Sequence, residues 1–252
     1  MDSGTTLYTS YDRHYARFGN VRPAERIFLP ALYHDYDRPW MKGLAKDAAI
    51  LDCGCGYGHQ LYALSKMGFT NLTGIELTEG SYAIAKLELS GMADVEHAEA
   101  FDYLRTCPGQ FDLILLNDVL EHVPREKTLE FLQLIRDALR PQGMVTIRVP
   151  NMASLLAQHS MYGDFTHLVG FTEFSLTQIL DIAGFVDHRF VSLRPKLFLN
   201  YRYPAKVVKS LGRFALSVAN DFLHRFLYLL RLQRPIPTQF GYNIEVYSGK
   251  GP

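Results

Sequence analysis

The chain has 252 residues, of which 48% are hydrophobic and 21% are charged. This length fits one large domain or a domain with an appendage, and the composition excludes a disordered chain. Basic and acidic residues number 26 each, so a formal net charge of zero gives no overall attraction to a polyanion. The balance is uneven, because ten Lys and Arg but only one Asp lie between Arg189 and Arg234. Such asymmetry points to a segment with a partner of its own.

Three cysteines, Cys53, Cys55 and Cys107, are too few for a disulfide framework and favour a reducing compartment. Cys53 and Cys55 have no third or fourth ligand near them in the sequence, so we predict no metal site. The first residues lack the pattern of a signal peptide, and no apolar run approaches the roughly 18 residues needed to span a bilayer. We expect a cytoplasmic protein, or one that is peripheral on the inner face of the membrane.

The chain begins with an aromatic-rich, charged segment, residues 1–48, which we expect to form helices. These would either close over a ligand as a lid or pack on the edge of a sheet. Beyond this segment, apolar runs alternate with segments of helical periodicity, and this alternation predicts a mostly parallel, doubly wound α/β sheet. The predicted strands are Ala49–Cys53, Leu72–Leu77, Val95–Ala98, Phe111–Leu116 and Met144–Val149. The predicted helices are Gln60–Met67, Ser81–Leu89 and Arg125–Leu139, and Pro141-Gln142-Gly143 predicts a turn.

A second block follows, with a helix over Phe174–Ala183 and a strand over Phe185–Leu193. Ile244–Tyr247 alternates between apolar and polar residues and predicts a strand that pairs antiparallel at the sheet edge. We therefore divide the chain into a lid, a core, a basic helical insertion and a final strand that completes the core. The residues of these four parts are 1–48, 49–195, 196–234 and 235–252.

A glycine-rich loop follows the first predicted strand. After Asp52, glycine fills every second position, at Gly54, Gly56 and Gly58. Glycines let backbone N–H groups approach a ligand, and the following helix adds the positive end of its dipole. Glu76 ends the second strand, where an acid can accept hydrogen bonds from ribose hydroxyls. The alternative is a structural turn followed by a solvated acid.

The loop and Glu76 together resemble the class I S-adenosylmethionine-dependent methyltransferases. The resemblance covers residues 45–195 and also rests on the stretches Ala98–Phe101, Phe111–Pro124 and Leu139–Gly143. It implies a seven-stranded, mostly parallel Rossmann-like sheet with an antiparallel edge strand and a helical insertion. It also implies S-adenosyl-L-methionine, rather than NAD, as the cofactor.

By position, the resemblance implies that Asp52 and the loop backbone hold the amino-acid part of the cofactor. The loop residues concerned are Gly54, Cys55, Gly56 and Gly58. Glu76 would bind the ribose hydroxyls, and Asn117 would contact the methionine part through its backbone.

The adenine would meet Glu99 or Ala100, with Leu77 and Phe101 as apolar walls. The family often has Asp where this chain has Glu99, and Asp102 is the alternative contact.

Methyl transfer depends mainly on positioning, but a hydroxyl acceptor must also lose its proton, so a general base helps. We predict His167 and His122 as candidate bases and group Asp164 with them, because all three follow the fourth or fifth strand. The alternative is that each histidine packs or hydrogen-bonds in its loop. His122 in particular belongs to a Glu-His-Val pattern that recurs in family members with different acceptors.

The run from Asp164 to Leu176 also resembles methyltransferases of bacterial surface-polysaccharide and glycolipid biosynthesis. This favours a sugar or glycan hydroxyl as the acceptor. A small aromatic or quinone-like lipid acceptor is the second hypothesis. The third is a protein that binds the cofactor without catalysis and recruits partners through its basic helix.

Residues 205–232 show apolar side chains at helical spacing, with basic and polar residues on the other side. This pattern predicts an amphipathic helix, either packed in the core, forming a homodimer, or lying on an anionic membrane surface. We expect no nucleic-acid partner, because the polar face has no aromatic residues to stack bases.

Overall fold

The structure is a computed structural model that describes residues 38–191, 204–230 and 235–252. Most of the predicted lid, residues 1–48, lies outside the described residues, as do parts of the basic insertion. Within the described part, Pro39–Met41 forms the short 3-10 helix η2, and the first strand begins at Ile50.

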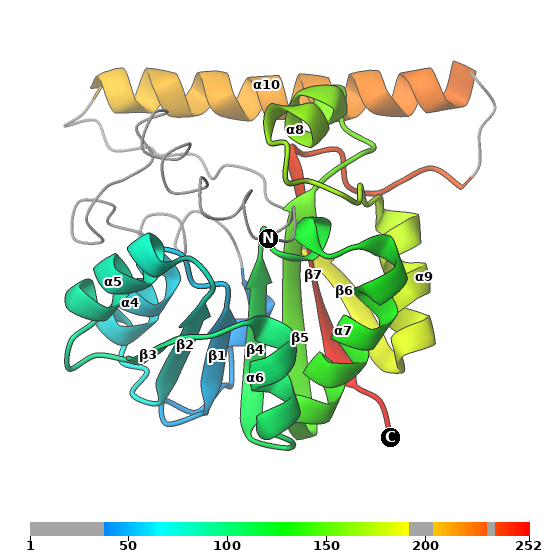
Figure 1. Cartoon of the computed structure of the whole chain (residues 1–252). Helices are drawn as coiled ribbons and strands as arrows, with labels where there is room; N and C mark the ends of the chain where they lie inside the picture. Colours follow the sequence, from blue (N-terminus) through cyan, green and yellow to red (C-terminus); the bar gives the residue numbers. More distant parts are fainter. Residues whose placement is uncertain (1–37, 192–203, 231–234) are drawn as a thin grey trace.

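A seven-stranded sheet in the order β3-β2-β1-β4-β5-β7-β6 forms the centre of the protein (Figure 1). Neighbouring strands from β3 to β5 pair in parallel, whereas β7 runs antiparallel to both β5 and β6 and lies between them. The predicted doubly wound, mostly parallel α/β fold is therefore confirmed. The strand predicted at Ile244–Tyr247 is antiparallel as expected, but it is not at the sheet edge, because β6 pairs with its outer side. The strands are β1 Ile50–Cys53, β2 Leu72–Glu76, β3 Asp94–His97, β4 Phe111–Asn117, β5 Leu139–Pro150, β6 Phe185–Val191 and β7 Asn243–Lys250.

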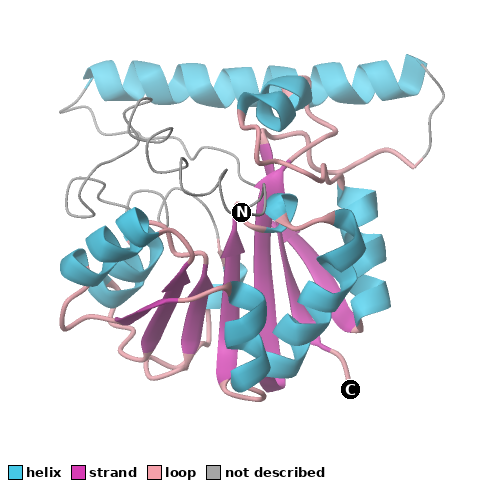
Figure 2. Ribbon diagram, viewed as in Figure 1, coloured by secondary structure: helices cyan, strands magenta, loops and turns pink. Residues whose placement is uncertain are grey.

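Helices cover both faces of the sheet, as Figure 2 shows. Alternate residues of β4 enter different apolar clusters, because successive side chains of a strand point to opposite faces. Leu113 and Leu115 pack with α4 and α5, whereas Ile114 and Leu116 pack with α6, α7 and α9. These helices are α4 His59–Lys66, α5 Glu79–Glu88, α6 Ala100–Thr106, α7 Arg125–Ala138 and α9 Glu173–Ala183.

Strand β5 differs from its prediction at its start. The turn expected at Pro141-Gln142-Gly143 is a bulge inside the strand, because Leu139 already pairs with Phe111 before the register shifts. Gln142 takes a positive φ of 68° in this bulge. The turn residues thus change the direction of the chain without ending its pairing with β4.

The remaining helices lie beyond the carboxyl ends of the parallel strands (Figure 1). They are the 3-10 helix η3 Leu120–His122 after β4, the short α8 Ala157–Gly163 after β5, and the 27-residue α10 Pro204–Leu230 before β7. In open α/β sheets, ligands bind at this edge. We therefore expect the functional site to lie between the carboxyl ends of the parallel strands and α10.

Candidate active site

The glycine loop joins β1 to α4, and its three glycines have different surroundings. Gly54, Gly56 and Gly58 all have positive φ angles, of 79°, 54° and 81°. A Cβ on Gly54 would lie 2.7 Å from Val119 Cγ2, and one on Gly58 would lie 2.6 Å from Leu89 Cδ1. A Cβ on Gly56 would have nothing within 4 Å. The outer glycines are thus needed for packing, whereas the middle one faces open space that a ligand can approach.

Glu76 at the end of β2 holds this loop in place. Its Oε2 accepts a hydrogen bond from the backbone N–H of Gly56 at 2.9 Å. Its Oε1 accepts from the backbone N–H of Thr78 at 2.8 Å and from the Thr78 hydroxyl at 2.9 Å. The acid predicted to bind ribose is therefore fixed in orientation beside the open middle glycine.

Asp52 at the end of β1 is buried, with 2% of its surface exposed. Burial raises the pKa of its carboxyl to about 7, although the positive charge of Arg148 lowers it and the charge of Glu76 raises it further. A cationic group arriving beside Asp52 would favour its charged form. This is the behaviour expected of a residue that receives the ammonium group of an amino acid.

The thiols of the loop point away from the open side. Cys53 and Cys55 are both buried, and burial raises the pKa of both thiols. A Cβ on Gly74 of β2 would lie 3.0 Å from the Cys55 Sγ, so this side chain packs against the sheet. The Cys55 side chain is therefore not available to a ligand, and a contact through its backbone remains a prediction.

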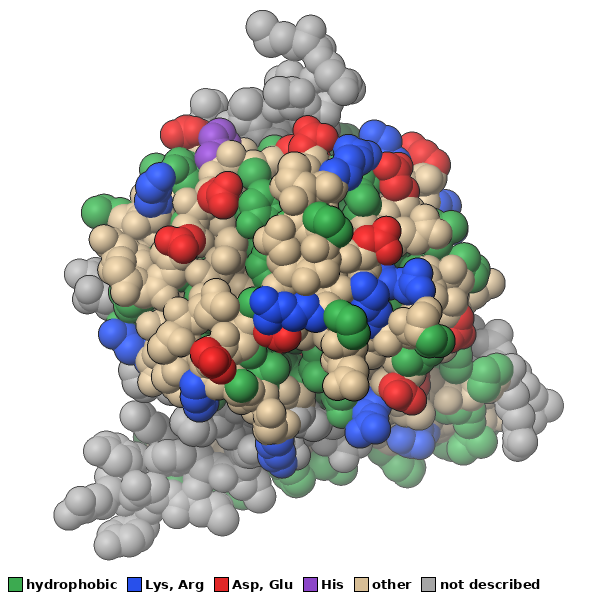
Figure 3. All heavy atoms as spheres, turned by 90° about the horizontal axis from the view of Figure 1, so that it is seen from below, with side chains coloured by type: hydrophobic (Ala, Val, Ile, Leu, Met, Phe, Trp, Pro, Cys, Tyr) green, Lys and Arg blue, Asp and Glu red, His purple; other side chains and the backbone are tan. Residues whose placement is uncertain are grey.

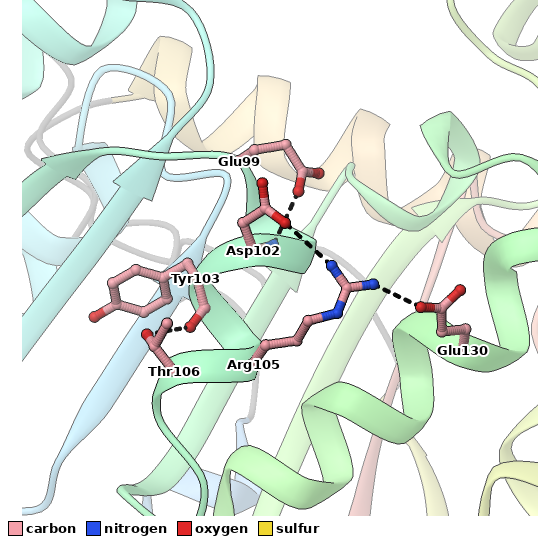
Figure 4. Close-up of polar contacts among 6 residues, drawn as sticks. All are labelled: Glu99, Asp102, Tyr103, Arg105, Thr106 and Glu130. Carbon is pink, nitrogen blue, oxygen red and sulfur yellow. Dashed lines mark hydrogen bonds and ion pairs between the residues drawn. The ribbon is translucent and has the colours of Figure 1, made fainter.

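Glu99 and Asp102, the two acids considered for the adenine, lie together at the start of α6 (Figure 4). Glu99 caps the helix, because its Oε2 accepts a hydrogen bond from the backbone N–H of Asp102 at 3.0 Å. Asp102 instead pairs with Arg105 at 3.1 Å, and Arg105 also contacts Glu130 at 2.7 Å. Both carboxylates thus have partners within the protein, and the adenine contact of Glu99 or Asp102 remains a prediction.

Leu77 and Phe101, the two predicted apolar walls of the adenine site, have different surroundings. Leu77 follows β2 with 42% of its surface exposed, so it is open to contact. Phe101 packs against Phe131 of α7 with ring centroids 5.0 Å apart, beside Ala100 in the same apolar cluster. The adenine contacts of Leu77, Ala100 and Phe101 remain predictions.

The carboxyl end of β4 carries two polar side chains. The Asn117 Nδ2 is buried and has no hydrogen-bond partner among the described residues. Asp118, at a positive φ of 56°, forms an ion pair with Arg148 of β5. The sequence predicted only a backbone contact for Asn117, and it gave no sign of the Asp118–Arg148 pair.

These features fit S-adenosylmethionine. The middle glycine is open, the acid at β2 is oriented, Asp52 is suited to a cationic group, and Asn117 has an unused donor. Each observation falls where the resemblance places a part of the cofactor.

The structure brings together His122, His167 and Asp164, the three residues predicted to be catalytic, and their catalytic roles remain predictions. The His122 Nδ1 lies 3.1 Å from the Thr166 carbonyl oxygen and 3.0 Å from its hydroxyl, which donates to Asp164 Oδ1 at 2.6 Å. The His167 Nδ1 lies 2.9 Å from the Ser160 carbonyl oxygen, and the two imidazole rings meet edge to face at 4.8 Å. Carbonyl oxygens accept only, so each neutral ring carries its proton on Nδ1 and its lone pair on Nε2.

The electrostatics of this group act on His122 and Asp164 in particular. Burial and the neighbouring His167 lower the pKa of His122. Burial alone would raise the pKa of Asp164, but hydrogen bonds from the hydroxyl and the backbone N–H of Thr166 hold this pKa below its ordinary value, and the electrostatic effect of the two nearby histidines acts in the same direction. An ionised Asp164 therefore orients Thr166, and through Thr166 the ring of His122.

Glu121 is a member of this cluster to which the sequence assigned no role. Its side chain is 2% exposed, and neither carboxylate oxygen has a hydrogen-bond partner among the described residues. Burial, reinforced by the charge of Asp118, raises its pKa well above the ordinary value. One ligand atom each from Glu121, His122 and His167 lie within 4.8 Å of one another, so these side chains could hold a metal ion.

Comparison with known proteins identifies the family. Residues 26–189 match the model of a family described as a methyltransferase domain. The chain belongs to this methyltransferase family. Its seven-stranded sheet has the fold of SAM-dependent methyltransferases of known structure.

Two curated relatives carry the name "Ubiquinone biosynthesis O-methyltransferase". The methyltransferase of Thiobacillus denitrificans is 41% identical over 78 residues, which cover 30% of this chain and 33% of that protein. The one of Pseudomonas aeruginosa is 33% identical over 105 residues, or 40% of this chain and 44% of that protein. The chain thus matches less than half of the length of either relative.

Solved structures resemble this methyltransferase over most of its length. A SAM-dependent methyltransferase from Archaeoglobus fulgidus has a TM-score of 0.62 at 21% identity and covers 95% of this chain and 99% of its own. The phosphoethanolamine N-methyltransferase 2 of Haemonchus contortus, solved with S-adenosylhomocysteine, has a TM-score of 0.57 at 16% identity. It covers 90% of this chain and 53% of its own. At such identities the likeness shows the shared fold.

Proposed function

We propose that this protein methylates a hydroxyl oxygen of an aromatic or quinone-like lipid acceptor. The observation that carries the proposal is the pair of histidines, His122 and His167, whose Nδ1 atoms are held by carbonyl oxygens. Val119 touches the position of a Gly54 Cβ, and His122 follows three residues later. The proton acceptors and the methyl-donor loop are therefore parts of one site.

In this mechanism, bound S-adenosylmethionine supplies an electrophilic methyl group on a sulfonium sulfur. His167 acts as the base, since its Nδ1 is held by the Ser160 carbonyl and its Nε2 lone pair can take the proton of the acceptor hydroxyl. His122, fixed by Thr166 and Asp164, positions the ring of His167. Taking up this proton makes the acceptor oxygen a stronger nucleophile.

Two arguments bear on the acceptor. The relatives named for ubiquinone biosynthesis support an aromatic hydroxyl, although they match only part of their own length. The loop that holds Asp164 and His167 also exposes large apolar side chains, with Phe165 at 85% and Leu168 at 53%. A sugar or glycan hydroxyl is the second candidate, which the resemblance around Asp164 supports.

A screen of acceptors tests the proposal. The purified chain is incubated with S-adenosylmethionine and either a catechol-bearing prenylated acceptor, a simple catechol or a set of sugars, and S-adenosylhomocysteine release is measured. We expect the prenylated catechol to give the fastest turnover. Turnover with sugars alone would favour the second candidate, and cofactor binding without any turnover would leave the non-catalytic hypothesis.

A divalent cation is a second candidate for acceptor activation, and the unpaired Glu121 is the observation that favours it. A buried carboxylate without partners is costly, whereas one carboxylate and two imidazoles suit a transition-metal ion. Bound there, a cation would lower the pKa of an acceptor hydroxyl and replace the base. Calorimetric titration with Mn²⁺ or Zn²⁺ separates the two candidates. If a cation activates the acceptor, we expect the metal ion to bind to the wild type and not to Glu121→Gln. If His167 acts as the base, we expect no metal binding, and turnover should be unchanged by EDTA.

A further inference from the structure

Helix α10 turns its polar side toward the body of the protein. His224 is 2% exposed, and its Nε2 accepts a hydrogen bond from the backbone N–H of Leu155 at 3.0 Å. Asn220 donates to the Phe240 carbonyl oxygen at 2.9 Å, and its own carbonyl lies 2.8 Å from the His224 Nδ1. The ring of His224 also stacks on Phe240. Hydrogen bonds from polar residues and ring contacts with Phe240 therefore hold α10 to the fold.

The apolar side of α10 points outward. Along this side, large side chains recur three, four or seven residues apart and are substantially exposed, with Val208 at 69%, Leu216 at 72% and Phe222 at 72%. A surface helix of a globular protein normally has the opposite orientation, with its apolar stripe toward the core. The others on this side are Leu211, Val218, Leu223, Phe226, Leu229 and Leu230.

This apolar surface is long and continuous. Twenty-seven residues at a rise of 1.5 Å give a helix of about 40 Å. Figure 1 shows α10 across the top of the molecule, with no described element on its outer side. On the opposite face of the molecule, basic and acidic side chains are interspersed (Figure 3). The outer side of α10 is thus a continuous exposed apolar surface, and exposed patches of this kind mark interaction sites.

The charges of α10 indicate what covers it. Val208 and Phe226 are 18 residues apart, or about five turns, so they lie on one line along the helix. Lys209 follows Val208 and Arg225 precedes Phe226, which places the two cations about 100° away from that line on opposite sides. Both are exposed, whereas the single acid of α10, Asp221, is partly buried. Cations that flank an apolar face are typical of helices lying in the interface of an anionic bilayer.

We propose that α10 binds the surface of an anionic lipid bilayer, with its apolar side in the acyl boundary and Lys209 and Arg225 among the headgroups. None of the described helices is both long and apolar enough to span a bilayer, so α10 would lie in the interface plane. A second copy of the chain fits less well, because it would bring the same exposed cations together, and the one acid of α10, Asp221, is partly buried.

The position of α10 has a consequence that rests on the proposed function. Because Leu155 is hydrogen-bonded to His224, the segment that leads to Asp164 and His167 begins directly under α10. The acceptor side of the site would therefore open near the lipid. An amphiphilic acceptor could reach His167 from the bilayer without crossing water.

Vesicle flotation with the full chain tests the bilayer proposal without measuring activity. The vesicles contain phosphatidylcholine alone or with phosphatidylglycerol. The test variant is Leu216→Asp/Phe222→Asp on the outer side of α10. The control is Leu87→Asp on α5, a side chain of similar exposure at 76%. A second variant, Lys209→Glu/Arg225→Glu, keeps the apolar side and reverses the flanking charges.

We expect the wild type and the Leu87→Asp control to float with anionic vesicles. The double aspartate variant should bind at least tenfold more weakly, and Lys209→Glu/Arg225→Glu should lose the preference for anionic lipid. Circular dichroism and S-adenosylmethionine binding check that each variant is folded. Wild type that binds neither kind of vesicle, or a Leu216→Asp/Phe222→Asp variant that binds as well as the wild type, would overturn the proposal. So would a stable dimer that fails to float and that the aspartates dissociate.

Discussion

The carboxylate of Glu76 accepts a hydrogen bond of 2.9 Å from the backbone N–H of Gly56, so the acid that ends β2 fixes the middle of the glycine loop after β1. The same carboxylate holds Thr78, the residue before α5. One side chain therefore orients two loops at the carboxyl edge. This relationship gives Glu76 a second task besides its predicted contact with ribose hydroxyls.

Glu76→Gln tests both tasks. A glutamine side chain has one oxygen acceptor in place of two, so the N–H of either Gly56 or Thr78 loses its partner. A hydrogen bond to a charged group contributes about 1.5–3 kcal/mol. We expect S-adenosylmethionine to bind about tenfold or more weakly in isothermal titration calorimetry. Glu79→Gln, in the exposed first turn of α5, is the matched control and should bind as the wild type does. Equal affinity in the two variants would contradict the role of Glu76.

The glycines of the loop should respond differently to alanine. Gly56→Ala meets open space, so we expect it to cost only about 1 kcal/mol of stability for its positive φ, yet to weaken cofactor binding strongly. Gly58→Ala would place a Cβ 2.6 Å from Leu89 and should lower the thermal midpoint much more. Thermal unfolding and calorimetric titration of both variants check the contrast. Equal loss of stability in both would show that the middle position is not open.

The raised pKa of Asp52 leads us to expect that the affinity for the cofactor depends on pH. Its pKa of about 7 means that the free protein holds a proton there below neutrality. A cationic ammonium group would expel that proton, so we expect affinity to fall as the pH drops from 7 to 5.5, toward tenfold per pH unit. Calorimetry in buffers of different ionisation enthalpy should detect the released proton below pH 7. Asp52→Asn should bind more weakly and lose this dependence, whereas unchanged proton release would point to another group.

The order of strands, glycine loop and helices was predictable because each signal is local. Apolar runs, glycine at every second position and the acid at Glu76 are all readable in short stretches of sequence, and the fold confirms them. The bulge at Gln142 was not predictable in the same way. Its turn residues are a local signal, whereas continued pairing of Leu139 with Phe111 depends on the neighbouring strand.

Two other features depend on tertiary packing. The unpaired state of Glu121 arises because η3 and the loop after α8 bury it without supplying a donor to its carboxylate. The sequence of α10 separates an apolar side from a polar one, but it does not say which side meets the body. Only the contacts of His224 and Asn220 decide that.

His167→Asn tests the proposed base. Removal of a general base lowers turnover by about 10²–10⁴-fold. We expect this loss in kcat, with S-adenosylmethionine affinity unchanged, because His167 acts on the acceptor. His159→Asn, on the exposed surface of α8, is the matched control and should keep full turnover. Full turnover in His167→Asn as well would remove His167 from the mechanism.

His122→Asn should behave as the loss of a positioning residue. It removes the edge contact with His167 while leaving the Ser160 carbonyl to hold that ring. We expect a smaller fall in kcat than in His167→Asn, and a shift of the pH–rate profile because the two imidazoles interact electrostatically. A pH profile identical to that of the wild type would contradict this role.

Glu121→Gln should stabilise the protein at alkaline pH. Burial raises the pKa of Glu121 above its ordinary value of 4.5, so the folded state holds this proton more tightly than the unfolded state. The contribution of the Glu121 proton to the free energy of unfolding is complete below pH 4.5 and is lost as the pH rises through the raised pKa of Glu121. Removing the titrating group should therefore raise the free energy of unfolding by about 1–3 kcal/mol at pH 8 and change it little at pH 4. Urea unfolding at both pH values, with chelator present, measures the difference. A variant that is less stable than the wild type at pH 8 would show that the carboxylate has a cationic or donor partner in solution.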